Sequence, residues 1–110
     1  MTATATRFGQ GSLNSSATIM MTPATALSTL TQVTFSNTKN AAETIEVYLV
    51  PSGGAPGPGN LIIPGQLLAP NQTYVSPELR GRTLNAGDAL YGFSTDALVV
   101  GFWIDGVVWS

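Results

Sequence analysis

The carboxylates are the residues of this sequence best suited to catalysis, because histidine and cysteine are both absent. Their absence removes the commonest general base and the thiolate nucleophile. Asp88, Asp96 and Asp105 each lie in a segment typical of a turn, where aspartate is favoured for its local hydrogen bonds. No D-x-D-x-D-G calcium loop is present, and a small sandwich leaves little room for a glycosidase cleft. We therefore expect neither a metal site nor a catalytic site.

Serine, threonine and glycine suggest no other chemistry. No histidine can activate a hydroxyl, and the single lysine, Lys39, lies in a predicted turn. The Gly/Pro-rich loop at residues 52–60 follows a predicted strand, but it lacks Gly-Lys-Ser/Thr, a full G-x-G-x-x-G and a following helix. We expect no cofactor, and we expect that the protein is not an enzyme.

Aromatic side chains offer the remaining possibility, a platform on which a sugar could stack. The candidates are Tyr48, Tyr74, Tyr91, Trp103 and Trp109. Most aromatic residues of a β-sandwich belong to its core, so sugar binding is an alternative here and not the main hypothesis.

The elements that position these residues are predicted to be strands. Residues 43–51 (ETIEVYLVP) alternate, with Ile45, Val47 and Leu49 on one face, which is typical of a half-buried strand. Further strands are predicted at residues 17–21, 27–36, 61–68, 89–94 and 98–104, with at most one helical turn, begun by Ser76 and Pro77. This pattern predicts an all-β antiparallel β-sandwich, with immunoglobulin-like or jelly-roll topology.

Asp105-Gly106 predicts a two-residue type I′ hairpin, after which residues 107–110 return as the last strand. In that register Val100, Phe102, Ile104, Val107 and Trp109 form a core face. Val99, Trp103 and Val108 form a second apolar face. Such a face needs a cover, which is either the N-terminal segment of the same chain or a partner subunit anchored on Trp103.

Residues 1–16 are small and polar and cannot form a core, so we expect an extended N-terminal arm before a single domain at 17–110. We expect this arm to lie on a neighbouring subunit, with Arg7 and Phe8 as its contacts. Arg80 and Arg82 flank Gly81, and they are either solvated or in contact with an acidic partner.

Charged residues make up 9% of the chain and the formal net charge is -2, which argues against nucleic-acid binding. A weakly charged surface suits a subunit packed against neighbours. The sequence has no signal peptide and no apolar run long enough to span a membrane, so we expect synthesis in the cytoplasm and no membrane partner.

Residues 45–54 read IEVYLVPSGG, and residues 71–90 read NQTYVSPELRGRTLNAGDAL. Together they resemble a pattern in small virion proteins of tailed bacteriophages, in which a VYLVPSGG strand and loop precede a TY-x-x-PEL…LN-x-GD segment. The resemblance covers about residues 45–90 and implies a structural role in a virion, without chemistry.

The main hypothesis is a non-enzymatic virion structural protein, namely a head decoration (cement) protein that bridges coat subunits. Its expected partners are the major capsid protein or other virion proteins and further copies of itself, as a dimer or trimer. Alternatives are a neck, tail or fibre-associated protein and, in a different class, a carbohydrate- or receptor-binding module. The candidate interface residues are Arg7, Phe8, Arg80, Arg82, Val99, Trp103 and Val108.

Overall fold

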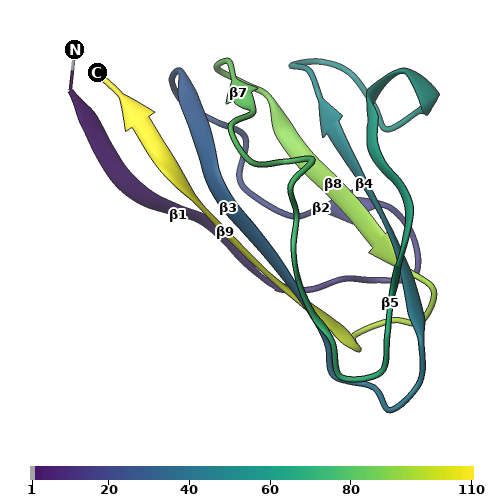
Figure 1. Cartoon of the computed structure of the whole chain (residues 1–110). Coiled ribbons are helices and arrows are strands. Elements are labelled where there is room, and N and C mark those ends of the chain that lie inside the picture. The colour runs from purple at the N-terminus through teal and green to yellow at the C-terminus, as the bar shows by residue number, and fades with distance from the viewer. Residues whose placement is uncertain (1) are drawn as a thin grey trace.

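Nine strands and one 3₁₀ turn form the regular structure of residues 2–110, which a computed structural model describes (Figure 1). The strands are β1 Ala3–Ser12, β2 Thr18–Ile19, β3 Ser28–Asn37, β4 Glu43–Val50, β5 Leu61–Leu68, β6 Thr73–Val75, β7 Thr83–Leu84, β8 Ala89–Ser94 and β9 Val100–Trp109; the turn η1 spans Pro58–Asn60. Within residues 2–110 helix is limited to this one turn, which lies in the loop predicted at residues 52–60; the helical turn predicted to begin at Ser76 and Pro77 is not helix.

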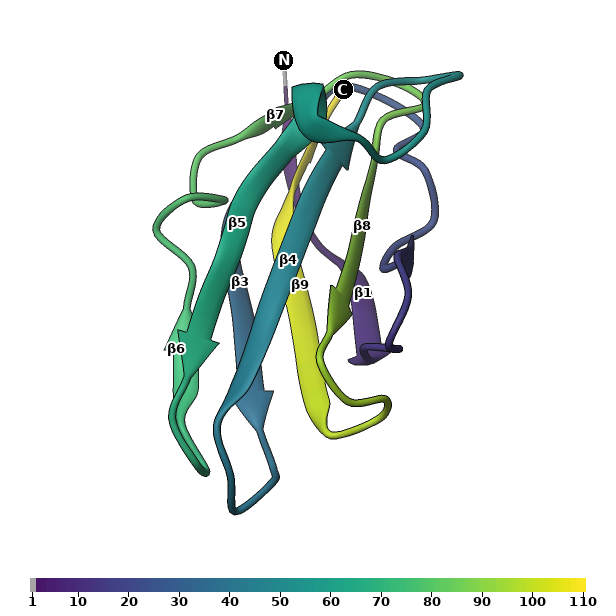
Figure 2. The ribbon, with the colours of Figure 1, turned by 90° about the vertical axis from the view of Figure 1, so that its right-hand side faces the viewer.

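The strands form two antiparallel sheets (Figures 1 and 2). The β9 sheet has the order β1-β9-β3-β6, with β7 also paired to β3, and the β4 sheet has the order β2-β8-β4-β5. The pairs are nested, because β1 joins β9, β2 joins β8, β3 joins β6 and β4 joins β5. This is the order of a jelly roll. The predicted β-sandwich is confirmed, and the strand order selects between the two topologies.

The core lies between the sheets and follows the predicted alternation. Ile45 and Val47 of β4 are fully buried against Phe35 of β3 and Ile104 of β9. Leu49 is half-buried and packs on the same cluster. The half-buried strand predicted at residues 43–51 is therefore confirmed as β4, which pairs with both β5 and β8.

The predicted C-terminal hairpin is wrong, because β9 runs without a turn from Val100 to Trp109. Asp105 pairs with Arg7 of β1 on one side and with Gln32 of β3 on the other. A type I′ turn needs positive φ at both central residues, and neither Asp105 nor Gly106 has it. With strands paired on both sides, continuing β9 keeps two ladders of hydrogen bonds that a hairpin would lose.

Both neighbouring strands instead bulge next to their pairs with Asp105, directly before Gly106. The register shifts between Arg7 and Gly9 in β1 and between Leu30 and Gln32 in β3, both opposite this part of β9. A Cβ on Gly106 would lie 2.5 Å from the Phe8 ring and would also overlap the Thr29 carbonyl oxygen. Glycine inside a strand commonly marks such a close approach.

The N-terminal segment lies within the fold over most of its length. Residues 3–12 form β1, an edge strand of the β9 sheet, and Leu13 is 1% exposed in the core. The sequence predicts an arm at residues 1–16 that is separate from the sandwich; the structure instead pairs this segment with β9 of the same chain. Its expected contact with a neighbouring subunit stays a prediction.

Replacing Gly106 with alanine should lower the free energy of unfolding by about 1–3 kcal/mol, because the added methyl group overlaps Phe8 and the Thr29 carbonyl. Urea denaturation measures the change. Gly59→Ala is the matched control, since a Cβ there meets nothing within 4 Å, and its effect should stay within about 0.5 kcal/mol. Equal stability of the two variants would contradict the packing described for Gly106.

Candidate functional site

The outer face of the β9 sheet carries an exposed tryptophan beneath an arginine. The side chain of Trp103 is 41% exposed, and the Arg7 guanidinium carbon lies 4.3 Å from the centroid of its ring. Arg7 comes from the edge strand β1 and Trp103 from the neighbouring β9, so sheet pairing brings together two residues far apart in the sequence. A cation over an exposed aromatic ring contributes about 0.5–1 kcal/mol, enough to favour one orientation of both side chains.

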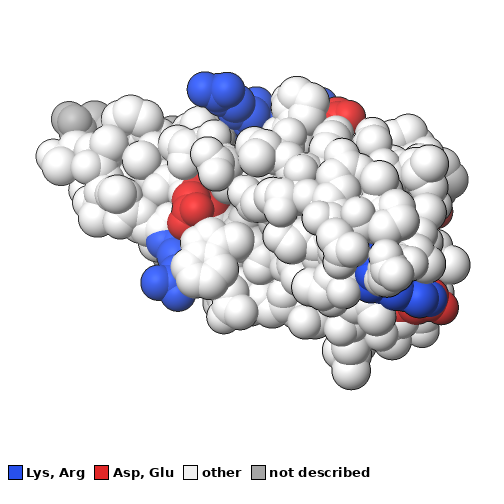
Figure 3. Space-filling model, turned by 60° about the horizontal axis from the view of Figure 1, so that its bottom comes forward, with Lys and Arg blue, Asp and Glu red and all other residues white. Residues whose placement is uncertain are grey.

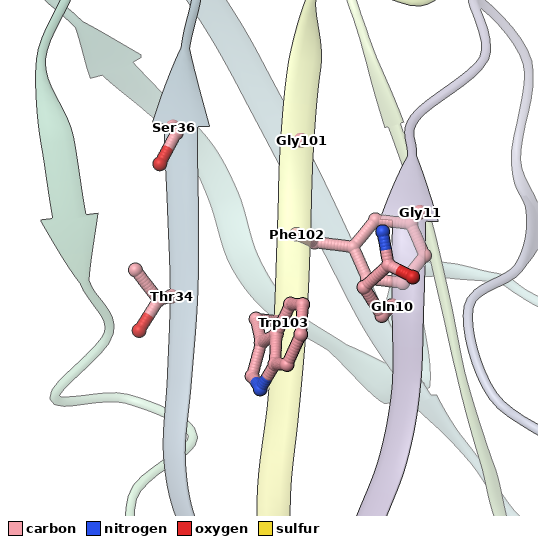
Figure 4. Close-up of a pocket in the computed structure, with 7 residues that line it drawn as sticks. All are labelled: Gln10, Gly11, Thr34, Ser36, Gly101, Phe102 and Trp103. Carbon is pink, nitrogen blue, oxygen red and sulfur yellow. The ribbon is translucent and has the colours of Figure 1, made fainter.

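Uncharged polar side chains surround Trp103. Its cross-strand partners are Gln10 of β1 and Thr34 of β3, and Ser36 lies further along β3 (Figure 4). A hollow of about 190 Å³ beside the ring is lined by Gln10, Gly11, Thr34, Ser36, Gly101, Phe102 and Trp103. We call the exposed part of this surface the Trp103 face and define it as Arg7, Gln10, Thr34, Ser36, Trp103, Asp105 and Val107.

A second, larger hollow lies on the other side of the indole. Its volume is about 530 Å³, and Arg7, Thr31, Asp105 and Val107 are among its lining residues. Both hollows are shallow and open to solvent, so the Trp103 face is suited to docking a surface or a chain and not to enclosing a small substrate.

Charge is sparse on the molecule. Figure 3 shows charged side chains in a few separate spots on an otherwise uncharged surface. Among residues 2–110 the salt bridges of basic residues involve Lys39 alone. The Arg7 guanidinium is therefore free to contact a partner as well as the Trp103 ring.

The structure separates the other residues of the predicted apolar face from Trp103. Val99 precedes β9 and is half-buried against the core. Because β9 continues through Gly106, Val108 points to the inner side, where it lines a hollow with Phe8, and Val107 points outward beside Trp103. Phe8, predicted as a partner contact, is half-buried on the core cluster. Of the candidate interface residues, the structure brings Arg7 onto the exposed Trp103 ring, and it brings Phe8 and Val108 together on the inner side of the sheet.

Trp109 also lies on the opposite side of the sheet from the one predicted, because β9 continues through Gly106. The hairpin register predicts it in the core, but the continuous strand puts it on the outer side, where its indole N–H donates to Thr29 Oγ1 at 3.1 Å. Sequence reasoning also missed Gln10, Thr34 and Ser36 as neighbours of Trp103. Uninterrupted alternation through Asp105-Gly106 is the signal that predicts Val107 and Trp109 beside Trp103, whereas the cross-strand neighbours require the pairing itself.

Arg80 and Arg82 are exposed on either side of Gly81, whose N–H donates to the Leu30 carbonyl oxygen of β3. The Arg82 Nε–H donates to the Glu78 carbonyl oxygen at 2.9 Å. The predicted cap is present, because Ser76 Oγ accepts from the Leu79 N–H at 3.2 Å, although residues 77–81 form turns and not a helix. The two arginines border this turn and do not join any other candidate residue.

Glu78 is the acceptor that organises this turn. It accepts from the Tyr74 hydroxyl at 2.6 Å and from the Ser76 hydroxyl at 3.0 Å. Partial burial raises the pKa of Glu78, but hydrogen bonds from Tyr74, its own backbone and Ser76 outweigh this and leave the pKa below its usual value. Burial and then the bond to Glu78 raise the pKa of Tyr74 to about 12.

The aspartates do not form a catalytic pair. Asp88 accepts from the N–H groups of Asn85 and Ser52, at 2.9 and 3.1 Å. Its bond to Asn85 stabilises the turn, as predicted. Asp96 pairs with Lys39, and this hydrogen bond lowers the pKa of Asp96 and raises that of Lys39. Asp105, predicted in a turn, lies within β9 instead.

Buried Glu43 ties the Lys39–Asp96 pair to the end of the sandwich. Its carboxylate accepts from the Asp96 N–H at 2.9 Å and lies 3.7 Å from Lys39 Nζ. These contacts join the loop after β3 to the turn after β8. Within residues 2–110 no three acidic residues come close enough to hold a metal ion.

Several residues that carry the resemblance make contacts within the fold. The loop at Ser52 and the turn at Asp88 are in contact, since the Ser52 N–H donates to the Asp88 carboxylate and a Cβ on Gly87 would lie 2.6 Å from the Ser52 Cβ. Leu79 of the PEL segment is fully buried. These two motifs therefore support each other in folding, and the second borders the Trp103 face, because Val75 pairs with Thr34.

No family model, curated protein or solved structure matches this chain. In the described part of the chain, no helix has the length and hydropathy to cross a membrane.

The Tyr74–Glu78 hydrogen bond should be visible in an alkaline titration. A folded-state pKa of about 12, above the usual tyrosine value of about 10, means that the stabilisation is complete below pH 10 and is lost as the pH rises towards 12. Tyrosinate absorbance should show an ionisation near pH 12 that disappears in Tyr74→Phe and persists in Tyr91→Phe. If the late ionisation survives in Tyr74→Phe, the assignment to Tyr74 is wrong.

Proposed function

We propose that the protein is a non-enzymatic structural protein of a virus particle, namely a head decoration protein that stabilises the shell by bridging coat subunits. The Trp103 face is its contact surface, and the partner is the major capsid protein. The protein then resides in the virion, after synthesis in the host cytoplasm.

One observation carries this proposal: an exposed tryptophan, oriented by an arginine, on a sheet face whose other neighbouring side chains are uncharged except for Asp105. The centres of protein interfaces are depleted in Lys, Glu and Asp and enriched in Trp and Arg. Truncating Trp and Arg at such centres causes the largest losses of binding free energy. Gln10, Thr34 and Ser36 add hydrogen-bonding groups without the desolvation cost of a charge.

The resemblance of residues 45–90 to small phage virion proteins supports the choice of a virion as the setting. The jelly-roll order is compatible with it, because viral capsid domains and lectins share this topology. A fold does not define a function, so the strand order supports a capsid role and a lectin role equally. A neck, tail or fibre-associated role uses the same contact surface and differs in the number of copies per particle.

Trp103→Asp should weaken binding to heads of the virus that encodes this protein, prepared without it, by at least about tenfold. Cosedimentation measures binding and gives the copy number. Many copies per head support decoration, whereas a few copies per particle indicate the neck, tail or fibre. Absence of binding by the wild-type protein would overturn the proposal.

Leu67→Asp is the matched control, because Leu67 is 60% exposed on β5 in the other sheet. It introduces the same charge at an exposed apolar position and should leave binding unchanged. Thermal unfolding of both variants should stay near that of the wild type; a large drop for Trp103→Asp alone would show that Trp103 stabilises the fold instead.

A second candidate, carbohydrate binding, is favoured by the hollow beside the indole. A sugar ring can stack on Trp103 while the Gln10 amide and the hydroxyls of Thr34 and Ser36 bond to its hydroxyl groups. Glycan-array binding that is lost in Trp103→Ala, is weakened in Gln10→Ala and persists in Leu67→Ala would establish this candidate. A wild-type protein that binds heads but no glycan would eliminate it.

A further inference from the structure

The β1 strand presents a long free edge to solvent. Among residues 2–110 it pairs only with β9, so one side of its backbone has no partner strand. Apart from Phe8, its residues are small or polar, and residues 3–5 are exposed. The N-terminal end of β1 and the C-terminal end of β9 lie side by side at one end of the molecule (Figures 1 and 2). An exposed strand edge is a template for pairing with another chain.

The other three edges are protected in ways that β1 is not. The β4 sheet ends in the two-residue strand β2 on one side and in β5 on the other. The β5 strand contains Pro64 and two register shifts. The remaining edge, β6, has only three residues. Short strands, proline and bulges are the devices that prevent edge pairing, and residues 2–7 of β1 carry none of them.

The alternation of backbone hydrogen bonds identifies which groups of β1 face outward. Thr2 and Ser110 exchange both backbone hydrogen bonds, at 2.6 and 2.9 Å. Since bonded and non-bonded pairs alternate along an antiparallel ladder, Thr4 and Thr6 also bond to β9. The N–H and C=O groups of Ala3, Ala5 and Arg7 therefore point away from β9, and the bulge at Phe8 ends this regular stretch.

We propose that the β1 edge is a homodimer interface, in which residues 3–7 pair antiparallel with the same residues of a second copy around a two-fold axis at Ala5. This pairing makes about six backbone hydrogen bonds between the copies. The inference stands apart from the proposed function, because it concerns the edge of the β9 sheet and needs no virus particle.

The stretch is complementary to itself in this register. Ala5 lies opposite Ala5 of the second copy, Ala3 opposite Arg7, and Thr4 opposite Thr6. Threonine pairs are favourable across strands, and no like charges lie opposite each other. The two Arg7 α-carbons are about 14 Å apart at about 3.4 Å per residue, beyond the screening length of about 8 Å at physiological salt.

The dimer places two binding surfaces on one side. Side chains of directly paired residues point to the same side of a sheet, so the outer faces of both β9 sheets become one continuous surface. Each dimer then presents two copies of Trp103 to the same partner. Two weak contacts of this kind reinforce each other when the partner is itself a repeating surface.

Ala5→Pro tests the interface without breaking the fold. The Ala5 N–H faces the free edge, so proline removes no bond to β9 but blocks the centre of the intermolecular ladder. Sedimentation equilibrium should give a dimer for the wild-type protein and a monomer for Ala5→Pro. Ser12→Pro is the control: its N–H also faces outward, but it lies beyond the bulge, and this variant should stay dimeric.

A cysteine variant tests the register even if Ala5→Pro fails to fold. The chain has no cysteine, so Ala5→Cys supplies the only thiol. Hydrogen-bonded antiparallel pairs have α-carbons about 5.5 Å apart, which a disulfide can span. Mild oxidation should therefore link Ala5→Cys dimers, but not Ala3→Cys, whose α-carbons are about 14 Å apart in this register.

Three results would overturn the proposal: a wild-type protein that stays monomeric at all attainable concentrations, an Ala5→Pro variant that remains dimeric, or equal crosslinking of Ala3→Cys and Ala5→Cys. Trp103→Asp should remain dimeric, which distinguishes this interface from the Trp103 face. A failure of head binding with an intact dimer would therefore count only against the proposed function.

Discussion

The β9 sheet depends on β9 remaining one strand past Gly106. Both of its neighbours bulge next to their pairs with Asp105, the residue before Gly106, and the Phe8 ring packs where a side chain on Gly106 would lie. This contact anchors β1 to the sandwich through a side chain as well as through backbone pairing. A residue other than glycine at this point would force the three strands apart and weaken the sheet that carries Trp103.

The same arrangement explains why the proposed contact surface and the proposed dimer edge lie together. Arg7 directly precedes the bulge residue Phe8, so one strand directs an aromatic ring inward and a guanidinium group outward over Trp103. The bulge also limits the regular free edge to the residues before it. Anything that alters packing at Gly106 should therefore affect both the Trp103 face and the β1 edge.

The residues that resemble phage virion proteins are explained by folding. A hydrogen bond from the Ser52 N–H to the Asp88 carboxylate joins the loop and the turn. The hydroxyls of Tyr74 and Ser76 donate to Glu78, in the turn that contains buried Leu79. The Trp103 face on β1, β3 and β9 lies outside the resemblance, whereas Val75 of β6, which pairs with Thr34, lies within it.

The sequence by itself determined the all-β class, most strands, the buried alternation in β4 and the roles of Ser76 and Asp88 in their turns. These depend on local alternation and turn chemistry, which a short window of residues contains. It also predicted Arg7 and Trp103 separately as candidate contact residues. Only the tertiary structure decided that they touch, that Asp105-Gly106 continues a strand, and that Phe8 and Val108 face inward. The physical reason is that β9 gains backbone partners from both ends of the chain, and this non-local pairing outweighs the local preference of Asp-Gly for a turn.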